Sequence, residues 1–119
     1  MKTELTFNPA TPIFRVGDLD VSLRFYVEQL GFRIDWRGDE DLFASVSRGR
    51  CTLFLCVGGQ GHPGGWIWVG MSDVDELHAE LRTKNVQIRS EPENYPWGSR
   101  EMHVQDPDGN VIRFASDTT

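Results

Sequence analysis

Long apolar runs are missing from this sequence, and their absence limits where the protein can work. No segment approaches the roughly 20 consecutive apolar residues that a membrane-spanning helix needs. The N-terminal segment MKTELTFNPATPI also lacks a continuous apolar stretch after its charges, so it shows neither a secretory signal nor a lipidation motif. We therefore expect a cytoplasmic protein with no membrane partner.

Basic residues and cysteines are also scarce. The chain has 12 Lys and Arg against 18 Asp and Glu, a net charge of -6, which argues against a nucleic-acid partner and favours cationic ligands. The two cysteines, Cys51 and Cys56, fall in one expected strand, on opposite faces and roughly 16 Å apart. They cannot form a disulfide without rebuilding that strand.

Recognisable catalytic motifs are missing as well. The glycine-rich segment GGQGHPGG at residues 58–65 precedes an expected strand and lacks the Lys-Ser/Thr of a phosphate-binding loop, and no Gly-x-Ser-x-Gly elbow occurs. Cysteines in an apolar strand are usually inert packing residues, and the carboxylates of residues 39–41 are typical of a solvated turn. His62, His78 and His103 share no ligand spacing. The sequence predicts no catalytic residue and no cofactor.

The patterns that are present predict an α+β fold. With 119 residues and a 39% hydrophobic fraction, the chain is expected to form one domain over residues 1–119. Apolar alternation predicts strands, and the spacing of Leu23, Phe25, Tyr26 and Leu30 predicts a helix that ends at Gly31. In order, the expected elements are a strand at 11–16, a helix at 21–30, and strands at 32–36, 42–47 and 51–57.

After the glycine-rich connection the same order begins again. Residues 66–71 read as a strand, and Asp73-Val74-Asp75 resembles the helix start Asp18-Leu19-Asp20. This self-similarity predicts two βαβββ modules, at about 11–57 and 66–116. Each module would curl its strands around an open face, so the pair should enclose a cleft.

The segment from Tyr95 to Phe114 is the most informative stretch. Residues 106–109, Asp-Pro-Asp-Gly, match a type I turn and predict a hairpin between two strands. Trp97 lies between Pro96 and Gly98 at the mouth of the first of these strands. Two interpretations of Trp97 remain open, a ligand contact and a plug at the end of a small core.

The first ten residues are polar and contain Pro9, with Pro12 close behind. Prolines at this spacing favour an extended arm over a helix. An extended arm can pack onto a second chain, which predicts an arm-exchanged homodimer with two equivalent clefts between the subunits.

Several segments together resemble the vicinal oxygen chelate superfamily, which includes glyoxalases, extradiol dioxygenases and bleomycin-binding proteins. The resemblance covers about the whole chain and rests on the repeated module order, on residues 18–26 (DLDVSLRFY) with 30–32 (LGF), and on 106–110 (DPDGN). Residues 66–69 (WIWV), 75–77 (DEL) and 96–101 (PWGSRE) are similar to the bleomycin-resistance branch.

This resemblance implies where a metal would be held. Enzymes of the superfamily bind a divalent metal through His, Gln or Glu, and the matching positions here carry Thr11, Trp66 and Arg113. Thr and Trp are not usual ligands, and the permanently charged guanidinium of Arg113 cannot coordinate a metal. We therefore predict that the metal site of the family is absent.

The same resemblance implies a ligand site made of aromatic rings. It places ligand contacts at Trp36, Phe43, Cys56, Trp66, Trp97 and Arg113. Such rings can stack on a flat heteroaromatic group, and the acidic residues Asp35, Asp39, Glu40 and Asp41 would attract a cationic tail. Arg113 would favour an anionic ligand unless a neighbouring carboxylate neutralises it.

Two functions follow as hypotheses. The first is sequestration of a bleomycin-type cationic glycopeptide antibiotic by a homodimer, giving resistance without chemical turnover. The alternative is a glyoxalase- or dioxygenase-like enzyme acting on an unknown small metabolite. The absence of visible catalytic machinery favours the first.

Overall fold

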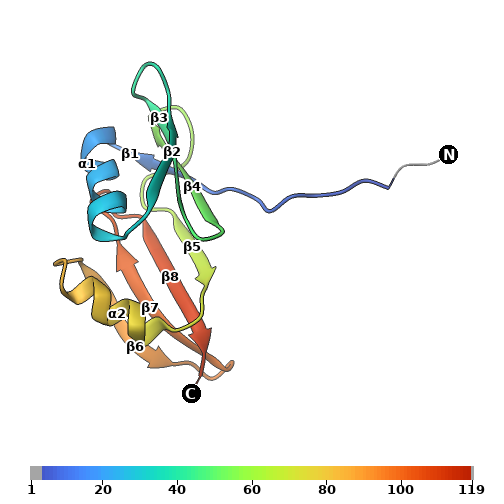
Figure 1. Ribbon diagram of the computed structural model, residues 1–119, viewed down its shortest axis with the longest axis vertical. Coiled ribbons are helices and arrows are strands. Elements are labelled where there is room, and N and C mark those ends of the chain that lie inside the picture. Colours follow the sequence, from blue (N-terminus) through green and yellow to red (C-terminus); the bar gives the residue numbers. More distant parts are fainter. Residues whose placement is uncertain (1–3, 119) are drawn as a thin grey trace.

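The computed structural model describes residues 4–118 and contains two four-stranded sheets (Figure 1). Sheet A is formed by β1 (Ile13–Val16), β2 (Arg33–Arg37), β3 (Phe43–Arg48) and β4 (Cys51–Val57), in the order β1-β4-β3-β2. Sheet B is formed by β5 (Trp66–Gly70), β6 (Ile88–Asn94), β7 (Ser99–Gln105) and β8 (Val111–Asp117), in the order β5-β8-β7-β6. In both sheets the first strand pairs in parallel with the last, and the other pairs are antiparallel. The predicted pair of βαβββ modules is confirmed.

The first helical segment differs from the single helix predicted for residues 21–30. α1 (Leu19–Arg24) begins at Asp18, whose side chain accepts a hydrogen bond from the Val21 amide, and a π-helical turn, η1 (Phe25–Gln29), follows. The extra residue of a π turn shifts the side chains that follow it around the helix axis. Phe25, Tyr26 and Leu30 are consequently all buried.

The second module follows the predicted pattern closely. α2 (Val74–Arg82) is capped by Asp73, whose carboxylate accepts hydrogen bonds from the amides of Asp75 and Glu76. The hairpin between β7 and β8 turns at residues 106–109, and Gly109 has the positive φ of 85° that favours glycine. The predicted turn is confirmed.

Strand β2 is an exception to the predicted alternation. It was expected to bury one face, but all five of its side chains are exposed because it is the edge strand of sheet A. The pairing register also shifts between Ile34 and Trp36, so Asp35 and Trp36 both lie opposite Ser45. This β-bulge turns Asp35 and Trp36 to one face of the sheet, where strict alternation would separate them.

Each sheet has one face covered by a helical segment and one open face. On β4, Leu53 and Leu55 are buried in the shared core, whereas Thr52 and Phe54 point to the opposite face and are only half-buried. On β7, Met102 and Val104 are likewise buried in the core. The side chains that alternate with these core residues along β4 and β7 therefore line the two open faces.

The turn at residues 106–110 joins the two modules. Asp106 accepts hydrogen bonds from the Tyr26 hydroxyl of η1 at 2.9 Å, from the Asn110 side-chain amide at 3.0 Å, and from the amides of Asp108 and Asn110. The Asn110 side chain also donates to the carbonyl of Arg15 on β1. Burial raises the pKa of Asp106 and, more strongly, that of Tyr26. We call Tyr26, Asp106 and Asn110 the module latch.

Residues 4–12 form an extended arm without helix or strand, so the arm expected from Pro9 and Pro12 also includes residues 11 and 12, which were predicted to begin the first strand. Figure 1 shows the arm leading away from the two sheets. Two apolar side chains of the arm, Leu5 and Phe7, are 84% and 91% exposed. Across residues 4–118, none of the helices has the length and apolar character to cross a membrane.

Candidate functional site

Aromatic side chains gather on the open face of sheet B. Trp66 and Trp68 lie two residues apart on β5, and Trp68 is paired in register with Arg113 of β8, which is in turn paired with His103 of β7. Trp66 and Trp68 are 52% and 58% exposed. We define the ring face by six residues of this surface: Trp66, Trp68, Trp97, Glu101, His103 and Arg113.

Trp97 reaches the ring face from the turn that precedes β7. The Gly98 amide donates to the Tyr95 carbonyl and Gly98 has a φ of 88°, so the chain reverses sharply at this point. The Trp97 ring stacks on Tyr95, with 4.8 Å between ring centroids, and remains 63% exposed. Trp97 is therefore not a plug of the core, and that interpretation is wrong.

A buried carboxylate lies beneath these exposed rings. Glu101 is completely buried, and it accepts hydrogen bonds from the Trp97 indole at 3.1 Å, from the Trp68 indole at 3.4 Å, and from both Nε and Nη2 of Arg113. Burial alone would raise the pKa of Glu101, but the hydrogen bonds from Arg113 and Trp97 outweigh it and lower the pKa to about 2. Glu101 is thus the carboxylate that neutralises Arg113.

This low pKa predicts a specific acid sensitivity. A carboxylate whose pKa is lower in the folded state stabilises the fold above its unfolded pKa, near 4.5, and loses this effect as the pH falls toward 2. We expect the free energy of unfolding of the parent to fall over that window, and to fall less in Glu101→Gln. Denaturant titrations at several pH values give the free energy of unfolding of both proteins. An equal pH dependence in the parent and in Glu101→Gln would contradict the low pKa assigned to Glu101.

His103 completes the ring face. Its ring meets the Trp66 ring edge-on, with 5.7 Å between centroids, and lies parallel to Tyr95. Burial and the nearby Arg113 lower the pKa of His103. The buried Nε2 atom of His103 has no hydrogen-bond partner within residues 4–118. It therefore leaves an unused polar atom beside the exposed rings.

The open face of sheet A carries a second, smaller group of rings. Trp36 and Phe43 are stacked, with 5.7 Å between centroids and 7° between planes, and Phe54 lies against both rings. Beside them Asp35 accepts hydrogen bonds from the hydroxyls of Ser45 and Ser47, and the bond from Ser47 lowers the pKa of Asp35. Asp35 also lies 3.4 Å from Nε of Arg33, so a cationic group that approached these rings would share the carboxylate with Arg33.

The six predicted ligand residues are divided equally between the two open faces. Trp36, Phe43 and Cys56 belong to sheet A, whereas Trp66, Trp97 and Arg113 belong to sheet B. Cys56 is buried, and its thiol donates to the Gly58 carbonyl. The structure therefore does not bring the six residues together within one chain.

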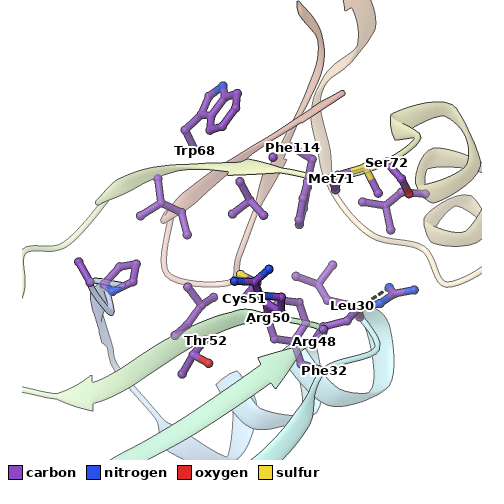
Figure 2. Close-up of a pocket in the computed structure, with 18 residues that line it drawn as sticks. Leu30, Phe32, Arg48, Arg50, Cys51, Thr52, Trp68, Met71, Ser72 and Phe114 are labelled. Carbon is purple, nitrogen blue, oxygen red and sulfur yellow. Dashed lines mark hydrogen bonds between the residues drawn. The ribbon is translucent and has the colours of Figure 1, made fainter. Parts of the chain in front are cut away.

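A cavity of about 660 Å³ lies between the modules, and none of the six residues lines it. Its walls are the start of β4, β5 and the residues after β5, together with Leu30, Phe32 and Phe114 (Figure 2). Trp68 contributes only its backbone side to this cavity, because its ring points away across β5 (Figure 2). The cavity is mostly apolar, and Arg48, Arg50 and Cys51 are among the residues that line it.

The family metal site does not fit the residues at its expected positions. Arg113 is engaged by Glu101, and the Trp66 ring contacts His103 instead of offering a donor atom. Within the described part of the chain, no three His, Cys, Asp or Glu side chains gather in a way that could hold a metal ion. A guanidinium at the centre of the site would also repel a cation.

Sequence reasoning did not identify Glu101, Tyr95 and Phe54 as members of these faces. Glu101 alternates with Met102 and Val104 in a strand, which is typical of a solvent-facing position. The only available signal was strand pairing, because Arg113 and Glu101 lie on the same face of adjacent strands and opposite charges are favourable there. Trp68 was not among the predicted ligand residues.

Two βαβββ modules, each with aromatic rings on its open face, define the architecture of this chain. The sequence matches the Glyoxalase/Bleomycin resistance protein/Dioxygenase superfamily over residues 6–114. The chain belongs to this superfamily, and the resemblance noted from the sequence is confirmed.

Three individual proteins illustrate the relationship. The uncharacterized protein YraH of Bacillus subtilis (strain 168) is 28% identical over 115 residues, covering 83% of this chain and 90% of YraH. A bleomycin-binding protein of Streptomyces verticillus, solved with copper(II)-bleomycin, is 28% identical with a TM-score of 0.80, covering 97% of this chain and 100% of that one. The transposon Tn5 bleomycin resistance determinant is 24% identical with a TM-score of 0.80, covering 95% and 100%, and shares the fold.

Proposed function

We propose that the chain works as a single domain that sequesters a bleomycin-type cationic glycopeptide in the cytoplasm, conferring resistance without chemical turnover. The observation that carries this proposal is the ring face, where exposed tryptophans surround a paired Arg113 in place of a metal site. Flat heteroaromatic groups gain stacking and desolvation on such rings. The Streptomyces verticillus relative, which is 28% identical, is described as a bleomycin-binding protein.

The complete site in this proposal needs two chains. Trp36 and Phe43 lie on a different sheet from Trp66 and Trp97, and the cavity between the modules contains none of these four rings. A second copy could bring its sheet B opposite sheet A of the first, with Asp35 near the cationic part of the ligand. The extended arm, with Leu5 and Phe7 exposed, supports such an exchange because apolar side chains gain free energy when they are buried.

We expect removal of residues 1–10 to weaken this dimer. Burial of a side chain such as Leu or Phe stabilises an association by about 1.5 to 3 kcal/mol, so losing Leu5 and Phe7 should raise the dimer dissociation constant by at least about tenfold. Light scattering and sedimentation of the full-length and truncated chains measure the dimer dissociation constant. Leu5→Ser/Phe7→Ser is the matched variant that keeps the arm length. A full-length chain that is monomeric at micromolar concentration would contradict the dimer.

Calorimetric titration with bleomycin tests the function directly. We expect the parent to bind both metal-free and copper-loaded bleomycin, with no change in the recovered drug, because the site holds rings and no catalyst. Elemental analysis of the same sample is the control. One zinc, nickel, iron or manganese per chain, removed by a chelator with loss of structure, would contradict the proposal and favour an enzyme of the superfamily.

A further inference from the structure

The burial of Glu101 is unusual for its surroundings. The side chain is completely buried, although the three tryptophans around it are each more than half exposed. Carboxylates are rarely buried this fully unless they are paired and hydrogen-bonded. Here the exposed rings are the cover, so Glu101 lies directly beneath the surface that a stacked ligand would touch.

The two oxygens of Glu101 have different partners. Oε1 receives both hydrogen bonds from Arg113, whereas Oε2 receives the indole N–H groups of Trp68 and Trp97. These partners come from β8, β5 and the turn before β7. One carboxylate therefore connects three separate segments at the centre of the ring face.

The geometry points to Glu101 as the positioning residue of the ring face, which fixes the Trp68 and Trp97 rings and cancels the charge of Arg113, and so determines whether the face accepts a cationic or an anionic planar ligand. This inference rests on the proposed binding of a planar ligand at the ring face. It adds a determinant of charge selectivity that acts through its neighbours and not by touching the ligand.

Charge cancellation matters because Glu101 is the carboxylate paired with Arg113, whereas Glu93, opposite Glu101 on β6, is exposed to solvent. The guanidinium of Arg89, from β6, lies 5.1 Å from the centre of the Trp66 ring and also donates to Gln105. Burial lowers the pKa of His103, which disfavours a positive charge on its ring. Without the negative charge of Glu101, Arg113 and Arg89 would make this face cationic and unfavourable for a cationic ligand.

Ring orientation is the second effect. An exposed tryptophan can rotate about two side-chain bonds, and ordering it on binding costs conformational entropy. The hydrogen bonds to Oε2 hold two indoles before any ligand arrives. Trp68 is further restricted because its ring edge lies over Gly70, where an added Cβ would come within 3.2 Å of the indole.

Two pyrene probes with the same ring and opposite charge, pyrenemethylammonium and pyrenesulfonate, test the charge effect. In the full-length protein we expect Glu101→Gln to shift the ratio of the two affinities toward the sulfonate by at least about tenfold, because Gln keeps an acceptor for the indoles but frees the Arg113 charge. Glu101→Gln/Arg113→Met should restore the parent ratio. Glu76→Gln is the matched control, since it removes an exposed carboxylate on α2, which packs against the core and lies away from the ring face.

The outcomes separate this inference from the proposed function. An equal shift in Glu76→Gln, or a shift that persists in the double variant, would overturn the charge effect. Near-ultraviolet circular dichroism of the ligand-free protein tests ring orientation. Glu101→Ala should weaken the indole bands, whereas Glu101→Gln should largely keep them. Unchanged indole bands in Glu101→Ala would overturn the positioning role. If neither probe binds the parent, the proposed function fails, and the dichroism result still decides whether Glu101 positions the rings.

Discussion

Replacing Trp97 by alanine should weaken bleomycin binding by at least about tenfold. The ring is 63% exposed, yet it is held by stacking on Tyr95 and by its hydrogen bond to Glu101. A large ring that is ordered before binding pays little conformational entropy when a ligand covers it. Truncation of such aromatic anchors typically costs about 2 kcal/mol or more.

Tryptophan fluorescence quenching and calorimetry both measure the affinity for bleomycin. Calorimetry is needed beside fluorescence because Trp97→Ala itself removes one fluorophore. Cys51→Ala is a suitable control, since Cys51 lines the cavity between the modules and lies away from the ring face. Raising the salt concentration should weaken binding moderately by screening acidic groups such as Asp35. If Trp97→Ala binds like the parent, the ligand does not stack on the ring face.

Local patterns in the sequence were sufficient to predict most of the fold. The caps Asp18 and Asp73 and the turn at residues 106–109 depend on interactions within four residues, so their chemistry is readable from the sequence. The π turn of η1 and the bulge at Asp35 were not predictable, because both are set by how neighbouring elements pack. The exposure of β2 likewise depends on its place at the edge of sheet A.

The candidate site was predictable in kind but not in arrangement. The resemblance to the superfamily implied an aromatic site, and residue type showed that Arg113 cannot hold a metal. The buried state of Glu101 was not readable, because it depends on Trp68, Trp97 and Arg113 from three other segments. No pattern within strand β7 distinguishes such a glutamate from a solvated one.

Asp106→Leu should destabilise the fold by about 3 kcal/mol or more, the largest loss of stability that we expect from a single substitution. The change leaves the Tyr26 hydroxyl, the Asn110 side-chain amide and two backbone amides without their acceptor. Each buried donor left unsatisfied costs about 1 to 3 kcal/mol, reduced where water can reach it. Because the module latch joins η1 and β1 to the β7–β8 turn, packing between the modules should loosen as well.

Chemical denaturation gives the free energy of unfolding for this series. Asp106→Asn should lose only about 1 kcal/mol, since it keeps one acceptor oxygen and the raised pKa of Asp106 shows that the negative charge itself is unfavourable there. Tyr26→Phe should lose a similar amount, because the Asp106 oxygen it contacts keeps its bond from Asn110.

Because burial raises the pKa of Asp106, its contribution to stability is complete at low pH and declines as the pH rises through the folded-state pKa, opposite to that of Glu101. Asp106→Leu within 1 kcal/mol of Asp106→Asn would show that the hydrogen bonds of the latch contribute little and that apolar packing alone holds the modules together.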